Sequence, residues 1–429
     1  MLGSPANVRV SPARRFRGRF TLPGDKSISH RLAILGALAN GESRFENFSS
    51  AADCASTLRC LEGLGVAIQR KGRSIVVRGE GPEGLHAAHR RLDAGNSGST
   101  LRMLAGAVAA RPFTTTLTGD ASLRRRPVER IAAPLRAMGA QVETSDGRAP
   151  LTLHGRPLRG IEWSLEVASA QVKTAILLAG LQADGVTSVI EPEKSRDHTE
   201  RLLPLFGAAV ETRGLHTSLR GGARLRSVQT TVPGDLSSAA FLIVAALTLP
   251  DSEVELDGVL MNPGRTAFLD VLCQMGGQIE THTATQQPEP VGRIVARSSE
   301  LRGIDVPPGL VPSLIDELPA LAIAGAHAEG RFAVSQAGEL RVKESDRIAA
   351  MVEGLRAMGV RVLERPDGFV LEGGARLQGA AVRSHGDHRI AMAFAVAALG
   401  AQGETEIDDA ECASVSFPEF WQVLDAARG

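Results

Sequence analysis

The sequence predicts an α/β fold built from six copies of one βαβα-type module with an extra strand. A strand end and a turn of small residues recur six times, and these turns start 67 to 76 residues apart. An apolar run follows most of the turns, and a second helix of a different type follows later in each module. Self-similarity at a nearly fixed period is typical of repeat architectures. The six turns begin at Leu22, Leu92, Leu165, Val232, Val306 and Val382.

The apolar runs that follow the turns are rich in Ala and Leu. Their length and alanine content favour buried helices over strands, because alanine is the strongest helix former and strands are usually shorter. We therefore expect helices over residues 31–38, 173–181, 239–247 and 390–399.

The second helix of each module has a different ending. Two apolar residues, two or three positions apart, precede a glycine, which fits a helix whose glycine adopts the left-handed cap conformation. The sixth helix of this type, predicted over 417–427, ends the chain instead. The five capping glycines are Gly65, Gly139, Gly207, Gly276 and Gly359.

The length of 429 residues predicts two to three domains, and six modules form either one array or two groups of three. Residues 16–20 alternate as in a strand that has no helix of its own, so we expect this strand to join the C-terminal group. The five arginines in residues 1–20 also resemble a transit peptide, but a strand after a loose tail is the favoured interpretation. The predicted domains are 21–231, and 1–20 together with 232–429.

Composition excludes several classes of protein. Lys+Arg and Asp+Glu are both 48, and a chain without net charge is a poor binder of nucleic acid or of an anionic membrane. Aromatic residues make up 3%, too few to stack RNA bases, and no apolar stretch is long enough for a transmembrane helix. The four cysteines form no CxxC motif, which argues against a disulfide scaffold and a structural zinc site. We expect a cytoplasmic protein.

The most concentrated signal for a binding site is LPGDKSISHR at residues 22–31. Gly24 allows a tight turn, and Asp25 is a typical cap for the helix that follows. Free N–H groups at a helix start bind phosphate or carboxylate, and Lys26 and Arg31 add positive charge. An ordinary capped helix is the alternative, and a Walker P-loop fits poorly because Lys26 does not follow a glycine.

Other turns in the N-terminal half have a similar character. GNSGSTLR at 95–102 exposes backbone donors, and GDASLRRRP at 119–127 directs three arginines at a helix N-terminus, where like charge is unfavourable unless an anion binds. ASAQVK at 168–173 supplies the neutral donors Ser169 and Gln171, and SRDHT at 195–199 is a polar helix entry. Flexible turns and solvated arginines are the alternative interpretation.

The C-terminal half contains acids in unusual places. Asp316 and Glu317 lie in an apolar run, where two carboxylates are costly unless they are paired or functional. RVKESDR at 341–347 gathers charges at a helix start, for which capping is the simpler explanation. SHGDHRIAM at 384–392 leads into an apolar helix, and its two histidines and aspartate raise the question of a metal. No further ligand cluster accompanies them, so we expect no metal.

Five of the six repeat turns, or the loops after them, carry Lys or Arg, although the whole chain is neutral. Helix starts from stacked repeats can converge on one cleft, so the expected ligand is small and polyanionic. Asp316 and Glu344 among the cations indicate proton transfer as well as binding. Five of the 48 basic residues are lysines, and each is of interest because an ammonium can release a proton and a guanidinium cannot.

In combination, these motifs resemble the enolpyruvyl transferase family, over nearly the whole chain from about Arg9 to Ala427. The resemblance implies two similar domains of three βαβαββ repeats each, arranged as inside-out α/β barrels with the active site in the interdomain cleft. It also implies a monomer with no cofactor. The implied reaction, in the shikimate pathway, transfers the enolpyruvyl group of phosphoenolpyruvate to the 5-hydroxyl of shikimate 3-phosphate. Phosphate is released by addition and elimination through a tetrahedral intermediate.

The resemblance also implies roles for individual residues. The implied catalytic groups are Lys26, Asp316 and Glu344. The residues implied to bind shikimate 3-phosphate are Lys26, Ser27, Arg31, Ser169, Gln171, Arg196, Asp316 and Lys343. Those implied to bind or line the phosphoenolpyruvate site are Lys26, Asn96, Gly98, Arg126, Gln171, Lys343, Arg347 and Arg389, and His388 is expected to border it. Because Gly98 leaves room in this pocket, inhibition by the competitive inhibitor glyphosate is expected.

The chain departs from the family pattern at some positions, and other functions compete with this interpretation. One branch of the family has an arginine where Ser122 stands and a lysine where Val415 stands, so Arg126 is expected to carry more of the phosphate binding. A sister transferase that uses a UDP-amino sugar typically has a cysteine in the loop matching 119–127, and this loop has none. An RNA 3′-phosphate cyclase needs a basic and aromatic surface for RNA, which this chain lacks. A non-catalytic phosphosugar-binding module leaves Asp316 and Glu344 unexplained.

Overall fold

The computed structural model describes residues 7–374 and 376–429. The chain divides into two compact units, one of Met1–Leu22 with Pro233–Gly429 and the other of Pro23–Val232. We call the first of these unit 1 and the second unit 2. The tail predicted ahead of the first strand falls on residues 1–6 and lies outside the described residues.

Six apolar helices form the centres of the two units. α8, α11 and α13 are buried on nearly every residue, which is the pattern of a helix surrounded by protein. The structure starts α1, α6 and α13 two to five residues before the apolar runs, because the polar residues Asp25, Ser169 and Asp387 cap them. The six helices are α1 (Lys26–Leu38), α3 (Gly98–Val108), α6 (Ala170–Gly180), α8 (Leu236–Thr248), α11 (Leu318–His327) and α13 (His388–Leu399).

The second helices end as the sequence predicts. The five capping glycines have φ between +86° and +115°, in the left-handed region. The sixth helix begins at Phe420, and the prediction of a start at Phe417 is wrong because Phe417 precedes a proline, which disfavours the helical conformation. These helices are α2 (Ala52–Gly63), α5 (Glu129–Met138), α7 (His198–Leu205), α9 (Ala267–Gln274), α12 (Arg347–Ala357) and α14 (Phe420–Ala427).

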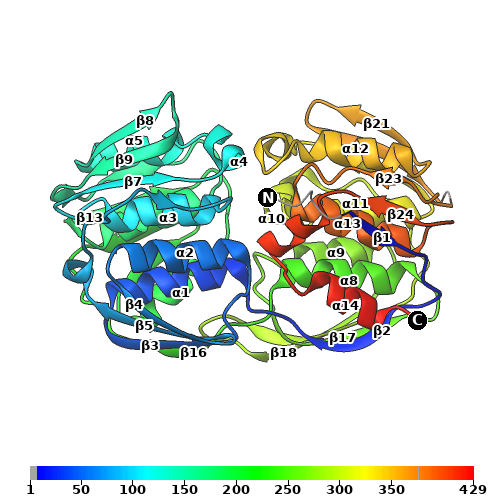
Figure 1. Cartoon of the computed structure of the whole chain (residues 1–429), viewed down its shortest axis with the longest axis horizontal. Coiled ribbons are helices and arrows are strands. Elements are labelled where there is room, and N and C mark those ends of the chain that lie inside the picture. The colour runs from blue at the N-terminus through cyan, green and yellow to red at the C-terminus, as the bar shows by residue number, and fades with distance from the viewer. Residues whose placement is uncertain (1–6, 375) are drawn as a thin grey trace. The chain divides into compact units, whose positions relative to one another are not determined.

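Small sheets surround the central helices of unit 2, as Figure 1 shows for α1 and α3. Strands such as β9 and β15 alternate between buried and more exposed residues, so each sheet has one covered face. One parallel pair and two antiparallel pairs make each four-stranded sheet. The first sheet is β16 (Gln229–Thr231), β3 (Asn40–Glu46), β5 (Ser74–Glu80) and β4 (Ala67–Lys71). The second is β6 (Leu92–Asp93), β7 (Thr114–Thr118), β9 (Arg148–His154) and β8 (Gln141–Ser145). The third is β11 (Glu162–Ser164), β13 (Val186–Ile190), β15 (His216–Arg220) and β14 (Val210–Arg213), and β10 (Leu158–Arg159) pairs with β12 (Ala183–Asp184).

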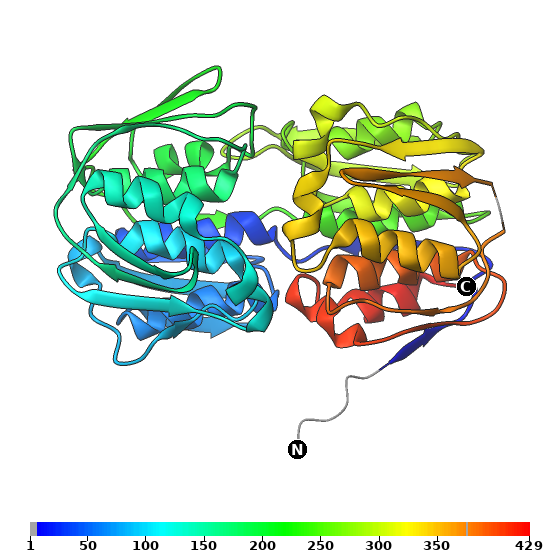
Figure 2. The same cartoon turned by 90° about the horizontal axis from the view of Figure 1, so that it is seen from above.

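Unit 1 also combines three small sheets with its helices, and Figure 2 shows it from a second direction. The N-terminal strand β2 pairs in parallel with β17, although the helix that follows β2 belongs to unit 2. Conversely, β16 pairs with β3 in unit 2, although the helix after it belongs to unit 1. The sheets are β18 (Gln278–Thr285), β19 (Val291–Arg297), β17 (Glu253–Leu260) and β2 (Arg17–Thr21); then β20 (Gly330–Val334), β22 (Gly368–Gly373) and β21 (Arg361–Arg365); then β1 (Val8–Val10), β24 (Thr405–Ile407) and β23 (Ala381–Val382).

In the part of the chain that the structure describes, no single helix combines the length and apolar character needed to cross a membrane. The segments Pro308–Leu314 and Leu318–His327 meet that test only as a pair, and the pair is bent by 119°.

Candidate active site

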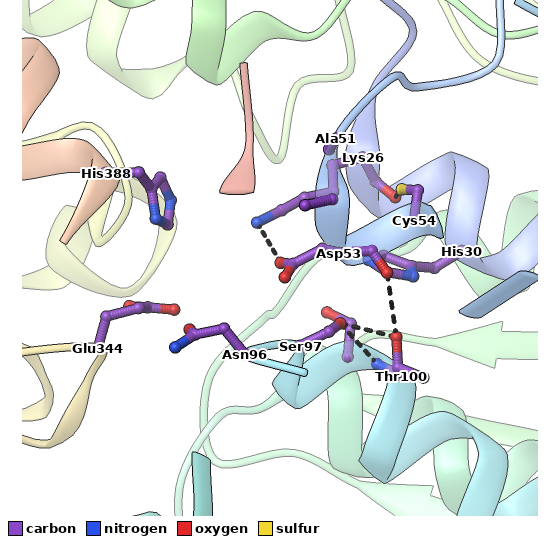
Figure 3. A network of polar contacts seen from close by, with 12 residues as sticks. Lys26, His30, Ala51, Asp53, Cys54, Asn96, Ser97, Thr100, Glu344 and His388 are labelled. Carbon is purple, nitrogen blue, oxygen red and sulfur yellow. Dashed lines mark hydrogen bonds and ion pairs between the residues drawn. The ribbon is translucent and has the colours of Figure 1, made fainter. Parts of the chain in front are cut away.

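The start of α1 in unit 2 carries Lys26 next to a buried acid. The Asp25 carboxylate caps the helix by accepting from the Ile28 N–H at 2.9 Å. The Lys26 ammonium lies 2.8 Å from the carboxylate of Asp53, in the first turn of α2, and only 15% of the Lys26 side chain is exposed. Figure 3 shows this pair. Sequence reasoning missed Asp53, because it lies in no motif and only the packing of α1 against α2 brings it to Lys26.

A chain of hydrogen bonds beneath this pair connects α1, α2 and α3, and Figure 3 draws the part that joins Asp53, Thr100 and Ser97. His30 Nδ1 lies 2.7 Å from the Thr57 hydroxyl, which lies 2.6 Å from the Thr100 hydroxyl. Thr100 in turn contacts the Ser97 hydroxyl at 2.8 Å and the Asp53 carbonyl at 3.3 Å. The chain therefore fixes α1, α2 and α3 relative to one another directly below Lys26.

Burial, together with the charges of Lys26 and Arg31, holds the pKa of His30 well below its usual value. The unfolded chain therefore binds a proton that the folded chain excludes, so this contribution to stability is complete above the unfolded pKa near 6.5 and is lost as pH falls below it. We expect His30→Asn to reduce the pH dependence of the free energy of unfolding between pH 6.5 and 5 by up to about 1.4 kcal/mol per pH unit, the limit for one proton. Urea titrations at several pH values measure it, with the exposed His282→Asn as control, and equal slopes in both variants would contradict it.

Arg126 lies over the loop that begins the second module. It donates to the Asn96 side-chain oxygen at 2.6 Å and to the Ser122 hydroxyl at 3.2 Å, and it is 7% exposed. Asn96 in turn donates to Asp120 at 2.7 Å. The arginine run stands ahead of a helix start, as the sequence predicts, because α5 begins at Glu129. Arg124 and Arg125 lie in the last turn of the short helix α4 (Ala121–Arg125), where a helix end favours positive charge.

Gly98 is the first residue of α3 and lies against two arginines. A Cβ at this position would be 2.4 Å from Nη1 of Arg102 and 3.6 Å from Nη1 of Arg126. Arg102 also donates to the Gln171 side-chain oxygen at 2.8 Å, and the Gln171 amide donates to Ser99 at 2.9 Å. Arg102, which was not among the predicted site residues, thus links the starts of α3 and α6.

Arg31 is 3% exposed and donates to oxygens of its own unit. It contacts the Thr199 hydroxyl at 2.8 Å, the Thr174 hydroxyl at 2.9 Å and the Ser27 carbonyl at 2.8 Å. Arg31 thereby connects α1 with α6 and α7.

The remaining predicted residues of unit 2 lie at nearby helix starts. Ser169 caps α6 by accepting from the Val172 N–H at 3.4 Å. The half-buried Arg196 lies in the segment between β13 and α7, directly before α7.

In unit 1, Asp316 lies between two arginines. Its carboxylate is 3.5 Å from Nη1 of Arg347 and 3.4 Å from Nε of Arg389, and its carbonyl accepts from Arg389 at 3.0 Å. Both arginines are buried, at 1% and 5% exposure. The starts of α11, α12 and α13 therefore bring together residues that are far apart in the sequence.

Asp387 organises the same cluster from below. It accepts from Nε of Arg347 at 2.8 Å and from the Arg389 N–H at 2.9 Å, while Glu344 also accepts from Arg347. Burial opposes the charged form of Arg347, but the carboxylates of Asp387 and Glu344 raise its pKa. Burial lowers the pKa of the Lys343 ammonium, Asp316 opposes that shift, and Arg347 adds to it.

The two histidines of the 384–392 motif are separated. His388 is 1% exposed, whereas His385 is partly exposed and lies 3.2 Å from Glu353. Within residues 7–374 and 376–429, no group of three or more His, Cys, Asp or Glu side chains has an arrangement that could hold a metal ion.

Each unit thus presents charged side chains at converging helix starts. Unit 2 contributes Lys26, Arg31, Arg102 and Arg126, and helix N-termini add to their positive potential, so the site favours phosphate and carboxylate groups. Unit 1 sets Asp316 and Glu344 against Arg347 and Arg389, which combines anion binding with carboxylates able to move protons.

Comparison with known proteins agrees with this chemistry. The model of the family EPSP synthase (3-phosphoshikimate 1-carboxyvinyltransferase) matches residues 10–424. A 3-phosphoshikimate 1-carboxyvinyltransferase of Acidithiobacillus ferrooxidans is 52% identical over 96% of this chain and 95% of the relative. That of Koribacter versatilis is 51% identical over 98% of each chain. An EPSP synthase structure from Acinetobacter baumannii superposes with a TM-score of 0.88 at 43% identity, covering 98% of each chain. With this agreement over nearly its whole length in both sequence and α/β fold, the chain belongs to the EPSP synthase family.

Proposed function

We propose that the charged helix starts of both units carry out the family's reaction. The chain is a 3-phosphoshikimate 1-carboxyvinyltransferase of the shikimate pathway, which serves aromatic amino acid biosynthesis. In this reaction the enolpyruvyl group of phosphoenolpyruvate moves to the 5-hydroxyl of shikimate 3-phosphate, and phosphate leaves. The observation that carries the proposal is the cluster of Asp316 and Glu344 with Arg347 and Arg389, since it joins proton-transfer groups to anion-binding groups in one place.

Phosphoenolpyruvate meets cations from both units in this proposal. Arg347 and Arg389 bind it from unit 1 and Arg126 binds it from unit 2, while Lys343, Asn96 and Gly98 line its pocket. This assignment is supported by the burial of the three arginines, because a desolvated guanidinium binds carboxylate and phosphate in a fixed geometry.

Shikimate 3-phosphate is bound mainly by unit 2. Ser27 and Arg31 hold its carboxylate, and Ser169 and Arg196 hold its phosphate. Gln171 lies between the two substrates, and Asp316 anchors the hydroxyls. Each substrate carries both phosphate and carboxylate, so the cations offset a repulsion that would otherwise keep the substrates apart.

The proton transfers fall to three groups. In the addition step, protonated Glu344 delivers a proton to the methylene carbon while Asp316 accepts the proton of the 5-hydroxyl; the carbon–carbon double bond becomes single as the new carbon–oxygen bond forms. In the elimination step, Glu344 takes a proton back from the methyl group, the double bond forms again, the carbon–oxygen bond to phosphate breaks, and Lys26 protonates the departing phosphate. Asp316 then returns its proton to solvent and Lys26 regains one, which restores the enzyme. The ion pair of Lys26 with Asp53 supports this role, because the carboxylate orients the ammonium.

We further propose that the two units act as domains that close on substrate, with the active site in the cleft between them. Each unit holds only part of the cationic site, so binding of an anion draws the two parts together. Small-angle scattering should show a smaller radius of gyration with saturating shikimate 3-phosphate than without it, whereas scattering that does not change would contradict closure.

Release of phosphate from phosphoenolpyruvate tests the proposed function directly. Purified protein is supplied in turn with shikimate 3-phosphate, shikimate and a UDP-amino sugar. Rapid release with the first acceptor alone supports the proposal, and release with the UDP-amino sugar alone would show that the chain has the activity of the sister transferase.

We also propose a cytoplasmic location, which is supported by the free cysteines Cys54, Cys60, Cys273 and Cys412. A monomer is proposed as well, and light scattering would test it.

A further inference from the structure

Lys173 is buried and takes no part in the proposed reaction. It lies in α6 at 1% exposure, and its ammonium is 2.7 Å from the Glu191 carboxylate and 2.6 Å from the Glu200 carboxylate. Both carboxylates are buried as well, with side chains 4% and 8% exposed. Lysine is almost never fully buried unless it is paired, so this site depends on the two ion pairs.

The two carboxylates mark the two ends of one segment. Glu191 directly follows β13, and Glu200 lies in the first turn of α7. The segment between them contains Arg196, and the Ser195 hydroxyl donates to Glu191. One ammonium therefore attaches both ends of the segment 191–200 to α6, the helix that begins next to Ser169.

Other contacts also restrict the C-terminal end of the same segment. Thr199 lies 2.6 Å from Thr174 of α6 and accepts from Arg31 of α1 at 2.8 Å. If the ammonium of Lys173 were removed, Glu191 and Glu200 would repel each other in a buried environment where charges are poorly screened. The middle of the segment, which carries Ser195 and Arg196, would then move.

We propose that Lys173 is a positioning residue that holds Arg196 at the phosphate of shikimate 3-phosphate, and so sets the preference for a phosphorylated acceptor. This inference rests on the proposed function. It adds that the preference depends on an ion cluster that does not touch the substrate. Lysine suits the position because its compact ammonium can donate to two carboxylates at once, whereas the planar group of arginine needs more space.

The test compares kinetic constants of Lys173→Met with those of the full-length wild-type chain. We expect KM for shikimate 3-phosphate to rise at least about tenfold while KM for phosphoenolpyruvate stays within about twofold, which equals a loss of roughly 1.4 kcal/mol in acceptor binding. The ratio of kcat/KM for shikimate 3-phosphate to that for unphosphorylated shikimate should fall by a similar factor. Lys173→Arg, which keeps the charge, should recover part of both losses.

Two more variants and a control keep the test decisive. Ser195→Ala and Glu191→Gln disturb the segment more gently, should raise the same KM by a smaller factor, and carry the test if Lys173→Met does not fold. Leu151→Ala is the control, because Leu151 is fully buried in β9 of the same unit and its truncation leaves a cavity. This variant should have a lower melting temperature but an unchanged ratio of KM for shikimate 3-phosphate to KM for phosphoenolpyruvate.

The outcomes separate the inference from the proposed function. An active wild type whose Lys173 and Ser195 variants lose only thermal stability, with an unchanged ratio of KM values, would overturn the inference alone. A wild type that releases no phosphate with shikimate 3-phosphate would overturn the proposed function, and the inference with it.

Discussion

Glu344→Gln should lower kcat by about two to four orders of magnitude, which is the usual contribution of a general acid or base. Glutamine has nearly the same shape and keeps an oxygen that can accept from Arg347, but it cannot carry a proton to and from the methylene carbon. Arg347 keeps its ion pair with Asp387, in which Nε lies 2.8 Å from the carboxylate, so Arg347 should stay in position beside Asp316. Both substrates should therefore bind with affinities within a few-fold of those of the wild type, as measured by calorimetry.

Isotope exchange makes this prediction sharper. If Glu344 moves the proton at the methylene carbon, the variant should also lose the incorporation of solvent deuterium into that carbon. Glu353→Gln is a matched control, because it removes a carboxylate from α12, where the Glu353 side chain is 52% exposed and lies 3.2 Å from His385. A Glu344→Gln variant with normal turnover would support a phosphosugar-binding module or assign the proton to another group. A rise in KM for phosphoenolpyruvate without a fall in kcat would reassign Glu344 to binding.

Local sequence patterns predicted the helices well because local physics determines them. The capping glycines carry their own signal, since a left-handed residue after a helix is most easily a glycine. α13 begins at His388, two residues before the predicted start at residue 390, because Asp387 caps it. α14 begins at Phe420 and not at Phe417, because the proline after Phe417 disfavours the helical conformation there.

Contacts between distant segments could not be predicted in the same way. No motif marks Asp53, whose carboxylate meets Lys26 only because α1 packs against α2. The short helix α4 is not predicted from the sequence, and it places Arg124 and Arg125 in its last turn. The role of Lys173 also depends on packing, because its two partners lie in other elements: Glu191 follows β13, and Glu200 lies in α7.

Gly98→Ala should weaken the phosphoenolpyruvate site without weakening the fold. Gly98 begins α3, and its φ is not among the positive values of the described residues, so alanine fits the backbone and is favoured in a helix by about 0.5–1 kcal/mol. The added Cβ would lie 2.4 Å from Nη1 of Arg102, the mobile end of a long side chain. Arg102 must therefore move, and its 2.8 Å hydrogen bond to Gln171 is broken or strained.

The expected result is a rise of about tenfold in KM for phosphoenolpyruvate, or roughly 1.4 kcal/mol of binding, with an unchanged or higher melting temperature. Inhibition by glyphosate should weaken by a larger factor, because a ligand that fills the space beside Gly98 loses that space entirely, whereas a smaller substrate can shift. Gly309→Ala is the control, because a Cβ there meets nothing within 4 Å. Steady-state kinetics with and without glyphosate measure both effects. Equal loss for substrate and inhibitor would mean that the methyl group acts through the displaced Arg102 alone, and no loss for either would remove Gly98 from the pocket.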